Sequence, residues 1–187
     1  MNSAEARSRL VEGNARYIAD QLDAQLQDAT RRAAVTGGQS PFAIVLSCAD
    51  SRVVPELIFD TGIGEIFVIR VAGNVANTST IASIEYAVAH LGVKLIVVLG
   101  HQSCGAVTAA IGGGDNGHNL NHLLAHLQPA VAACPGADVD TVVQDNARKT
   151  AQELKDRSAI IGGAAAKDLS VVPAWYVLET GKVEYLD

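Results

Sequence analysis

The chain has 187 residues and a net charge of −6, and 49% of its residues are hydrophobic, 18% charged and 4% aromatic. This length suits one domain with a substantial hydrophobic core, and the small charged fraction indicates that self-association removes surface from water. The negative charge and the scattered lysines and arginines argue against nucleic acid or an anionic membrane as a partner.

The sequence contains no apolar run near the ~20 residues of a membrane-spanning helix. Its first 20 residues lack the apolar core of a secretory signal, so we expect a cytoplasmic protein. The three cysteines at positions 48, 104 and 134 are then expected to bind metal, act in catalysis or pack in the core, and not to form disulfides.

Two weakly amphipathic helices are predicted at the N-terminus. The first is capped by Ser3 and runs to Ile18, and the second covers about residues 22–34 and ends at Gly37 and Gly38. Because each has only a weak apolar face, we predict that residues 1–38 form a helical arm that packs on a partner subunit.

Three short apolar runs follow, at residues 41–48, 65–73 and 94–101, and each is typical of a strand buried on both faces. A helical pattern at 80–91 separates the second from the third, so these two strands and the helix form a βαβ unit in a parallel sheet.

The remaining chain is predicted to complete one α/β domain over residues 39–187. Its elements are helices at 106–111, 120–133 and 138–157, and two strands within 169–186 around a turn at 179–182. The fold class is therefore α/β, with a mostly parallel central sheet flanked by helices, an N-terminal helical arm and a C-terminal strand hairpin.

Two of the apolar strands end in residues that can bind a metal ion. The first ends at Cys48 and the third at His101, and Cys104 follows three residues later on a turn that enters a helix. Ligands gather at the carboxyl ends of strands in open α/β sheets. Two thiolates and one imidazole suit tetrahedral Zn²⁺, and three protein ligands leave a fourth position open, as in catalytic zinc sites.

Other cysteines and histidines have simpler interpretations. Cys134 is best explained as inert packing, and His90 as a structural residue. His118, His122 and His126 recur at helical spacing and can in principle bind a metal, but a solvated helix face is favoured. They are at best candidates for proton transfer.

Asp50 and Arg52 follow Cys48 closely, and we predict that the planar guanidinium fork holds the carboxylate beside the zinc. The alternative is a surface ion pair worth little. Zn²⁺ with two thiolates is formally neutral and acidifies water less than an all-histidine site. Asp50 would therefore help by accepting a hydrogen bond from zinc-bound hydroxide.

The motifs "CADSR" and "GHQSCGAV", with "EIFVIRVAGN" between them, closely resemble the β-class carbonic anhydrases. The resemblance runs from about residue 39 to residue 110. It implies that Cys48, His101 and Cys104 bind Zn²⁺, that Asp50 and Arg52 form a catalytic dyad, and that the reaction is reversible hydration of carbon dioxide to bicarbonate and a proton. It also implies a homodimer, or a homotetramer or larger assembly, with active sites at subunit interfaces.

The resemblance further implies a set of substrate-binding residues, some supplied by the neighbouring subunit: Gln39, Phe67, Ala72, Tyr86 and Gly105. Core and helix packing explain Phe67 and Tyr86 equally well. Some bacterial members have a regulatory bicarbonate pocket with a Trp three residues before the first cysteine. Val45 stands at that position, so we expect the pocket to be absent and the Asp50–Arg52 pair to be engaged, although the matching Arg70 is retained.

Two other functions stay open. One is hydrolysis of carbonyl sulfide or carbon disulfide on the same scaffold, because the same attack on a linear electrophile serves both reactions. The other is a non-catalytic zinc-binding assembly protein, against which the Asp50–Arg52 pair argues. A zinc deaminase is excluded because its H-x-E and P-C-x-x-C motifs are absent.

Overall fold

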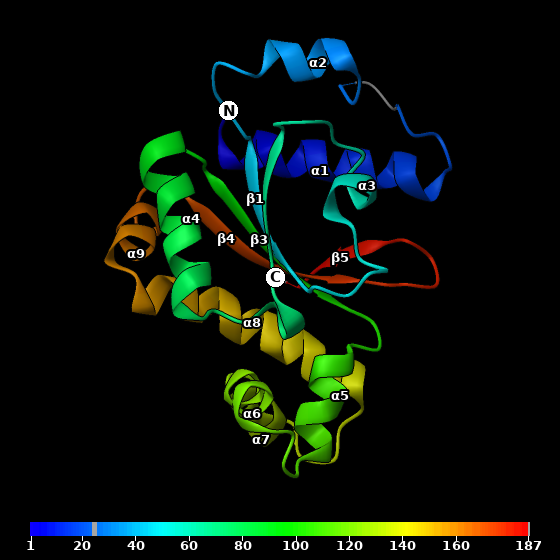
Figure 1. Ribbon diagram of the computed structural model, residues 1–187, viewed down its shortest axis with the longest axis vertical. Helices are drawn as coiled ribbons and strands as arrows, with labels where there is room; N and C mark the ends of the chain where they lie inside the picture. Colours follow the sequence, from blue (N-terminus) through cyan, green and yellow to red (C-terminus); the bar gives the residue numbers. More distant parts are fainter. Residues whose placement is uncertain (24–25, 187) are drawn as a thin grey trace.

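A computed structural model describes residues 1–23 and 26–186 (Figure 1). Within these residues the strands are β1 (Ala43–Ser47), β2 (Ile66–Arg70), β3 (Leu95–His101), β4 (Ser170–Tyr176) and β5 (Val183–Tyr185). The helices are α1 (Ser3–Ile18), α2 (Ala29–Ala34), α3 (Pro55–Ile58), the 3₁₀ turn η1 (Ala72–Asn74), α4 (Thr78–Leu91), α5 (Gly105–Gly112), α6 (His118–Ala125), α7 (Gln128–Ala133), α8 (Val139–Arg157) and α9 (Ala159–Ala165).

The five strands form one sheet in the order β2-β1-β3-β4-β5. β2, β1, β3 and β4 are parallel to their neighbours, and β5 pairs antiparallel with β4. The predicted α/β class, the mostly parallel sheet and the C-terminal hairpin are therefore confirmed.

Helices cover both faces of this sheet. Val45 and Val97 face α1 and α3, where they meet Leu10 and Phe59. The opposite face of β1 and β3 packs against α4, α8 and α9 through a second cluster that includes Ile84, Leu154 and Ile161. Burial on both faces explains why these strands are continuous apolar runs in the sequence.

Helix α1 packs on the chain's own sheet. Ala6 and Leu10 are fully buried, and a side chain at Gly13 would collide with the carbonyl oxygen of Phe59. Asn14 donates hydrogen bonds to the carbonyls of Ile58 (3.1 Å) and Gly181 (2.8 Å) and accepts one from the N–H of Val183 (2.9 Å). Packing of the arm on a partner subunit stays a prediction.

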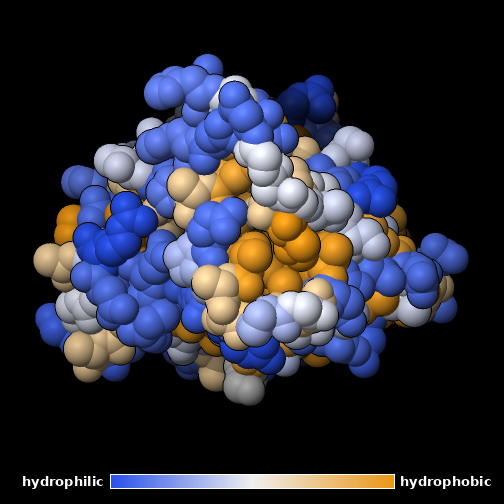
Figure 2. Space-filling view, turned by 90° about the horizontal axis from the view of Figure 1, so that it is seen from below, coloured by the Kyte–Doolittle hydropathy of each residue, from blue (hydrophilic) through white to orange (hydrophobic). Residues whose placement is uncertain are grey.

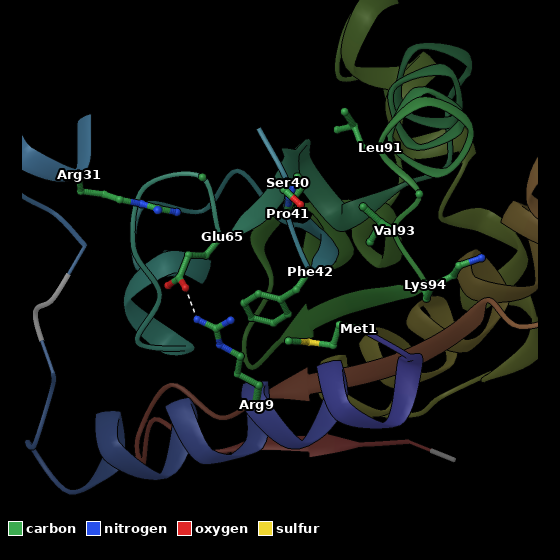
Figure 3. Close-up of a pocket in the computed structure, with 12 residues that line it drawn as sticks. Met1, Arg9, Arg31, Ser40, Pro41, Phe42, Glu65, Leu91, Val93 and Lys94 are labelled. Carbon is green, nitrogen blue, oxygen red and sulfur yellow. Dashed lines mark hydrogen bonds and ion pairs between the residues drawn. The ribbon is translucent and has the colours of Figure 1, made fainter. Parts of the chain in front are cut away.

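The amino ends of β1 and β2 are also tied to α1. Arg9 forms an ion pair with the buried Glu65 at the start of β2, and its guanidinium lies 4.3 Å from the ring centroid of Phe42 (Figure 3). These contacts border a cavity of about 380 Å³ at the end of the sheet opposite to Cys48.

Several predicted helix limits are wrong. Asn2, not Ser3, caps α1, in a capping box with Glu5. The helix predicted at 22–34 is reduced to α2, because Leu26 has a positive φ of 62° and Asp28 caps a new helix; residues 24 and 25 lie outside the described residues. The helix predicted at 120–133 is two helices, α6 and α7, and Pro129 lies in the first turn of the second.

Two α-helices and the turn η1 were not predicted, and the strand predicted at 65–73 is shorter because η1 occupies its end. Pro55 begins the single turn α3, and Ser158 separates α9 from α8 because its backbone is extended and its side chain accepts a hydrogen bond from the N–H of Ile161. No helix in the described part of the chain is both long and apolar enough to cross a bilayer.

The packing of α1 can be tested with two neighbouring substitutions. Leu10 is fully buried and Val11 is 47% exposed. We expect Leu10→Ala to lower the free energy of unfolding by about 2–5 kcal/mol, because it leaves a cavity in the core. Val11→Ala should cost less than about 0.5 kcal/mol. Denaturant unfolding followed by Trp175 fluorescence measures both, and equal small effects would show that α1 does not pack here.

Candidate metal centre

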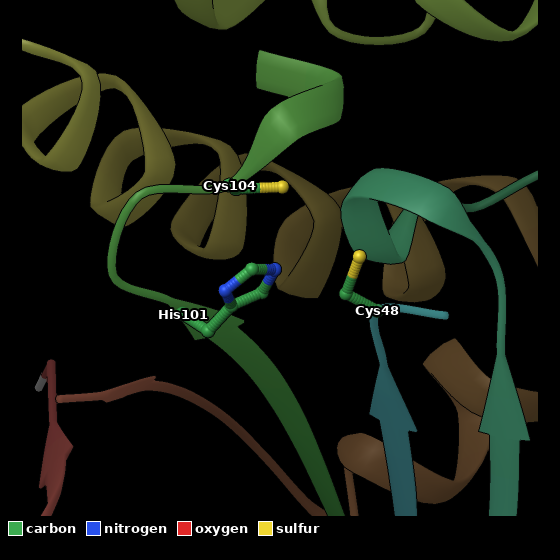
Figure 4. Close-up of side chains that lie close together, drawn as sticks. All are labelled: Cys48, His101 and Cys104. Carbon is green, nitrogen blue, oxygen red and sulfur yellow. The ribbon is translucent and has the colours of Figure 1, made fainter. Parts of the chain in front are cut away.

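The ends of β1 and β3 bring three predicted ligands together (Figure 4). These strands are parallel neighbours with Ser47 opposite Leu99, so Cys48 and His101 both follow at the same edge of the sheet. The ligand atoms of Cys48, His101 and Cys104 all lie within 4.8 Å of one another, and all three residues are buried. The described residues contain no other group of this kind.

A tight turn returns the chain from His101 to Cys104. Ser103 has a positive φ of 55°, and its N–H donates a hydrogen bond of 2.7 Å to Asp140 at the start of α8. Cys104 is the residue before α5, as the H-x-x-C spacing predicted. Asp140 was not predicted from the sequence, because nothing near it in the chain marks its contact with this turn.

The imidazole of His101 is oriented for a metal ion. Its Nδ1 lies 2.9 Å from the carbonyl oxygen of Gln102, which fixes Nδ1 as the protonated nitrogen and leaves a lone pair on Nε2. Nε2 is buried and has no hydrogen-bond partner within the described chain. A buried nitrogen of this kind is costly unless it is satisfied, so this atom fits a metal ligand.

The two buried thiols also fit a cation. The thiol of Cys104, which contributes most, His101 and the Gly73 N–H lower the pKa of Cys48 to about 4. The neighbouring Cys48 sulfur and burial raise the pKa of Cys104. Ionisation of one sulfur therefore disfavours ionisation of the other, whereas a divalent cation would stabilise both thiolates.

Asp50 and Arg52 form the predicted pair. The Arg52 side chain donates two hydrogen bonds to the carboxylate, of 2.9 Å from Nε and 2.7 Å from a terminal nitrogen, and its backbone N–H donates a third. The guanidinium holds the pKa of Asp50 well below its usual range. One carboxylate oxygen lies 3.8 Å from Nε2 of His101, so the pair stands beside the three ligands.

A second arginine holds the backbone of the same loop. Arg70, at the end of β2, donates hydrogen bonds to the carbonyls of Cys48 (3.0 Å) and Asp50 (2.7 Å). Val45, where a regulatory pocket would need Trp, is fully buried in the core. The sequence pointed to Arg70 only through the family resemblance and did not predict these contacts.

The predicted substrate-binding residues lie in different places. Ala72 and Gly105 are chain neighbours of Gly73 and Cys104, close to the ligands. Phe67 lies in β2 with its ring centroid 6.5 Å from that of the half-exposed Tyr86 in α4. Gln39 precedes β1 and is exposed, so it lies beyond the opposite end of the strand from Cys48. Their roles stay predictions.

The remaining histidines and Cys134 do not join the metal centre. His122 and His126 contact each other, with ring centroids 5.6 Å apart, and line a separate open cavity of about 480 Å³ with Arg157. His90 contacts Tyr86, and Cys134 is a half-buried free thiol at the end of α7.

Comparisons with known proteins identify the family of this chain. A family model described as carbonic anhydrase matches residues 43–183. The chain belongs to the β-carbonic anhydrases. A carbonic anhydrase of Mycolicibacterium smegmatis is 40% identical over 98% of this chain and 93% of its own length. Carbonic anhydrase 2 of Mycobacterium tuberculosis is 38% identical over 100% and 94%.

The fold of this β-carbonic anhydrase also matches solved structures. A chain from work on two tetrameric β-carbonic anhydrases of the ascomycete Sordaria macrospora superimposes with a TM-score of 0.77 and 25% identity, and 97% of each chain is covered. This family consists of zinc enzymes, and Cys48, His101 and Cys104 are able to hold such an ion.

Metal binding can be tested with two cysteine variants. We expect the wild-type protein to bind one Zn²⁺ per chain and Cys48→Ser to bind far less, because the variant loses a thiolate ligand. Cys134→Ser is the matched control and should keep full occupancy, since Cys134 lies outside the group. Elemental analysis after zinc loading and dialysis measures the occupancy. Equal loss in both variants would contradict the ligand assignment.

Proposed function

We propose that this protein catalyses the reversible hydration of carbon dioxide to bicarbonate and a proton, with Zn²⁺ held by Cys48, His101 and Cys104. The buried, unpartnered Nε2 of His101 between two thiols, with the Asp50 carboxylate 3.8 Å away, is the observation that carries the proposal. The family membership and the names of the relatives support it.

Zinc would supply the Lewis acidity that turns a water molecule into a nucleophile near neutral pH. The residues of the chain orient that water molecule. Because its pKa is held low, Asp50 is a carboxylate throughout the neutral range, and it can only accept a hydrogen bond there. The bidentate contact with Arg52 fixes the plane of the carboxylate and therefore the direction in which it accepts.

No specific observation favours the alternative functions. The relatives and structures named above are described as carbonic anhydrases. A non-catalytic zinc protein would not need a carboxylate held beside the ligands by a guanidinium fork. The cytoplasmic location and the absence of nucleic-acid and membrane partners stay predictions.

We also propose that the active protein is a dimer or a larger assembly. β1 spans about 15 Å, so Gln39 cannot reach the metal centre of its own chain and would serve only a neighbouring subunit. Beside the edge strand β2 lies an open cavity of about 520 Å³ lined by apolar side chains such as Leu57 and Ile63. The face seen in Figure 2 also carries a group of apolar side chains ringed by hydrophilic ones, as a covered surface would.

Carbon dioxide hydration by the zinc-loaded protein can be followed by stopped flow from about pH 6.5 to 9. We expect fast turnover that rises with pH, because the attacking water must lose a proton. Asp50→Asn should lower kcat/KM by roughly 100-fold or more, since the amide cannot replace the accepting carboxylate.

Asp168→Asn is the matched control for this experiment, because Asp168 forms an exposed ion pair with Lys94 away from the ligands. It should leave turnover unchanged. A flat, water-like rate from wild-type protein with full zinc content would refute the proposed activity, and a gas-release assay with carbonyl sulfide would follow.

Self-association can be tested by light scattering at micromolar concentrations. We expect a mass of at least two chains, and a shift of Leu57→Glu toward the monomer, because a charge would be buried in the interface. Ile160→Glu is the matched control, since Ile160 and Leu57 are each 45% exposed and Ile160 lies on α9. A monomeric wild-type protein would contradict the proposed assembly.

A further inference from the structure

A backbone N–H contacts one of the metal-binding sulfurs. The N–H of Gly73 donates a hydrogen bond of 3.3 Å to Sγ of Cys48, in a buried part of the molecule. Hydrogen bonds to a thiolate stabilise its charge, and they set both the direction of its lone pairs and its strength as a ligand. The position of the Gly73 peptide is therefore part of the metal centre.

Gly73 lies in a turn that favours glycine. Its φ is +71°, and a Cβ at this residue would lie 3.1 Å from both terminal methyl carbons of Leu127. The N–H of Asn74 closes the turn on the carbonyl of Val71 at 2.9 Å. Because glycine has an unusually large conformational freedom, a second constraint on the carbonyl side of the same peptide adds to the definition of this turn.

Asn146 supplies this second constraint. It lies in the middle of α8, is only 3% exposed, and donates from Nδ2 to the carbonyl oxygen of Gly73 at 3.0 Å. The bond satisfies a buried carbonyl and fixes the backbone on the far side of Gly73 from its N–H. Two hydrogen bonds on opposite sides of Gly73 therefore connect α8 with the Cys48 sulfur through the backbone of this one residue.

We propose that Asn146 is a positioning residue of the metal centre, which holds the Gly73 turn so that its N–H stays directed at the Cys48 sulfur. This proposal rests on zinc binding by Cys48, His101 and Cys104 and not on the reaction that the zinc serves. Partners of metal ligands commonly contribute about 10- to 100-fold to metal affinity. Asn146 contributes to metal affinity indirectly, because Gly73 lies between it and Cys48.

A merely structural amide would behave differently. Its loss would destabilise the domain, but the folded protein would bind metal as before. The readouts must therefore report on the folded metal centre: zinc affinity from competition with a chelator, and the sulfur-to-metal charge-transfer absorption of the Co²⁺-substituted protein. Thermal unfolding of the metal-free protein reports stability separately.

The main variant is Asn146→Leu, which keeps the branched shape of the side chain and cannot donate a hydrogen bond. We expect zinc affinity to fall roughly 10-fold or more and the Co²⁺ charge-transfer band to shift, because the Cys48 sulfur loses its N–H partner. The matched control is Thr150→Ala, one turn further along α8 and 4% exposed. This control should leave the zinc affinity within about twofold of wild type. It should also leave the charge-transfer band of the Co²⁺-substituted protein at its wild-type position.

If Asn146→Leu does not fold, Asn146→Ala replaces it, since the smaller side chain leaves room at the carbonyl of Gly73. Either variant with lowered thermal stability but wild-type zinc affinity and Co²⁺ spectrum overturns the proposal. A wild-type protein that does not bind zinc overturns it together with the proposed function. Tight zinc binding without carbon dioxide hydration refutes the proposed function alone, and the Asn146 comparison still decides this role.

Discussion

Two thiols and an imidazole nitrogen are buried together where β1 and β3 end, and this is the constraint on which the site depends. Burying polar groups without partners is costly, and the charge on one sulfur disfavours ionisation of its neighbour unless a cation is bound. The strand order settles where the groups meet, because parallel neighbours end at the same edge. This β-carbonic anhydrase therefore buries the polar atoms that are most costly to leave without partners at a position where a metal ion can bind them.

Each ligand is oriented by a different part of the chain. His101 is set by the carbonyl of the next residue, Cys104 by a turn that Asp140 holds, and Cys48 by the N–H of Gly73. α8 contributes to two of these contacts through Asp140 and Asn146. The helix that covers the apolar face of β3 and β4 thus also supports the metal centre, so packing of the core and geometry of the site are linked.

Features that depend on near neighbours in the chain were predicted well from the sequence. The apolar runs of β1 and β3 and the H-x-x-C spacing predicted that Cys48, His101 and Cys104 lie at or just after strand ends, and the structure brings these three residues together. Contacts across long separations were not predicted, because an asparagine such as Asn146 in a helix carries no local mark of a carbonyl 73 positions away. Helix limits failed where one side chain decides them, as with Asp28 before α2 and Ser158 between α8 and α9.

The loop after β1 is held by two arginines with separate tasks. Arg70 binds the carbonyls of Cys48 and Asp50, whereas Arg52 binds the Asp50 carboxylate. The backbone that positions the Cys48 sulfur is therefore fixed independently of the side-chain fork that aims the carboxylate. The side chain of Arg52 is 53% exposed, so solvent screens its ion pair with Asp50. A change in this pair can therefore redirect the carboxylate without moving Cys48. Different residues therefore hold the backbone at Cys48 and the side-chain carboxylate of Asp50.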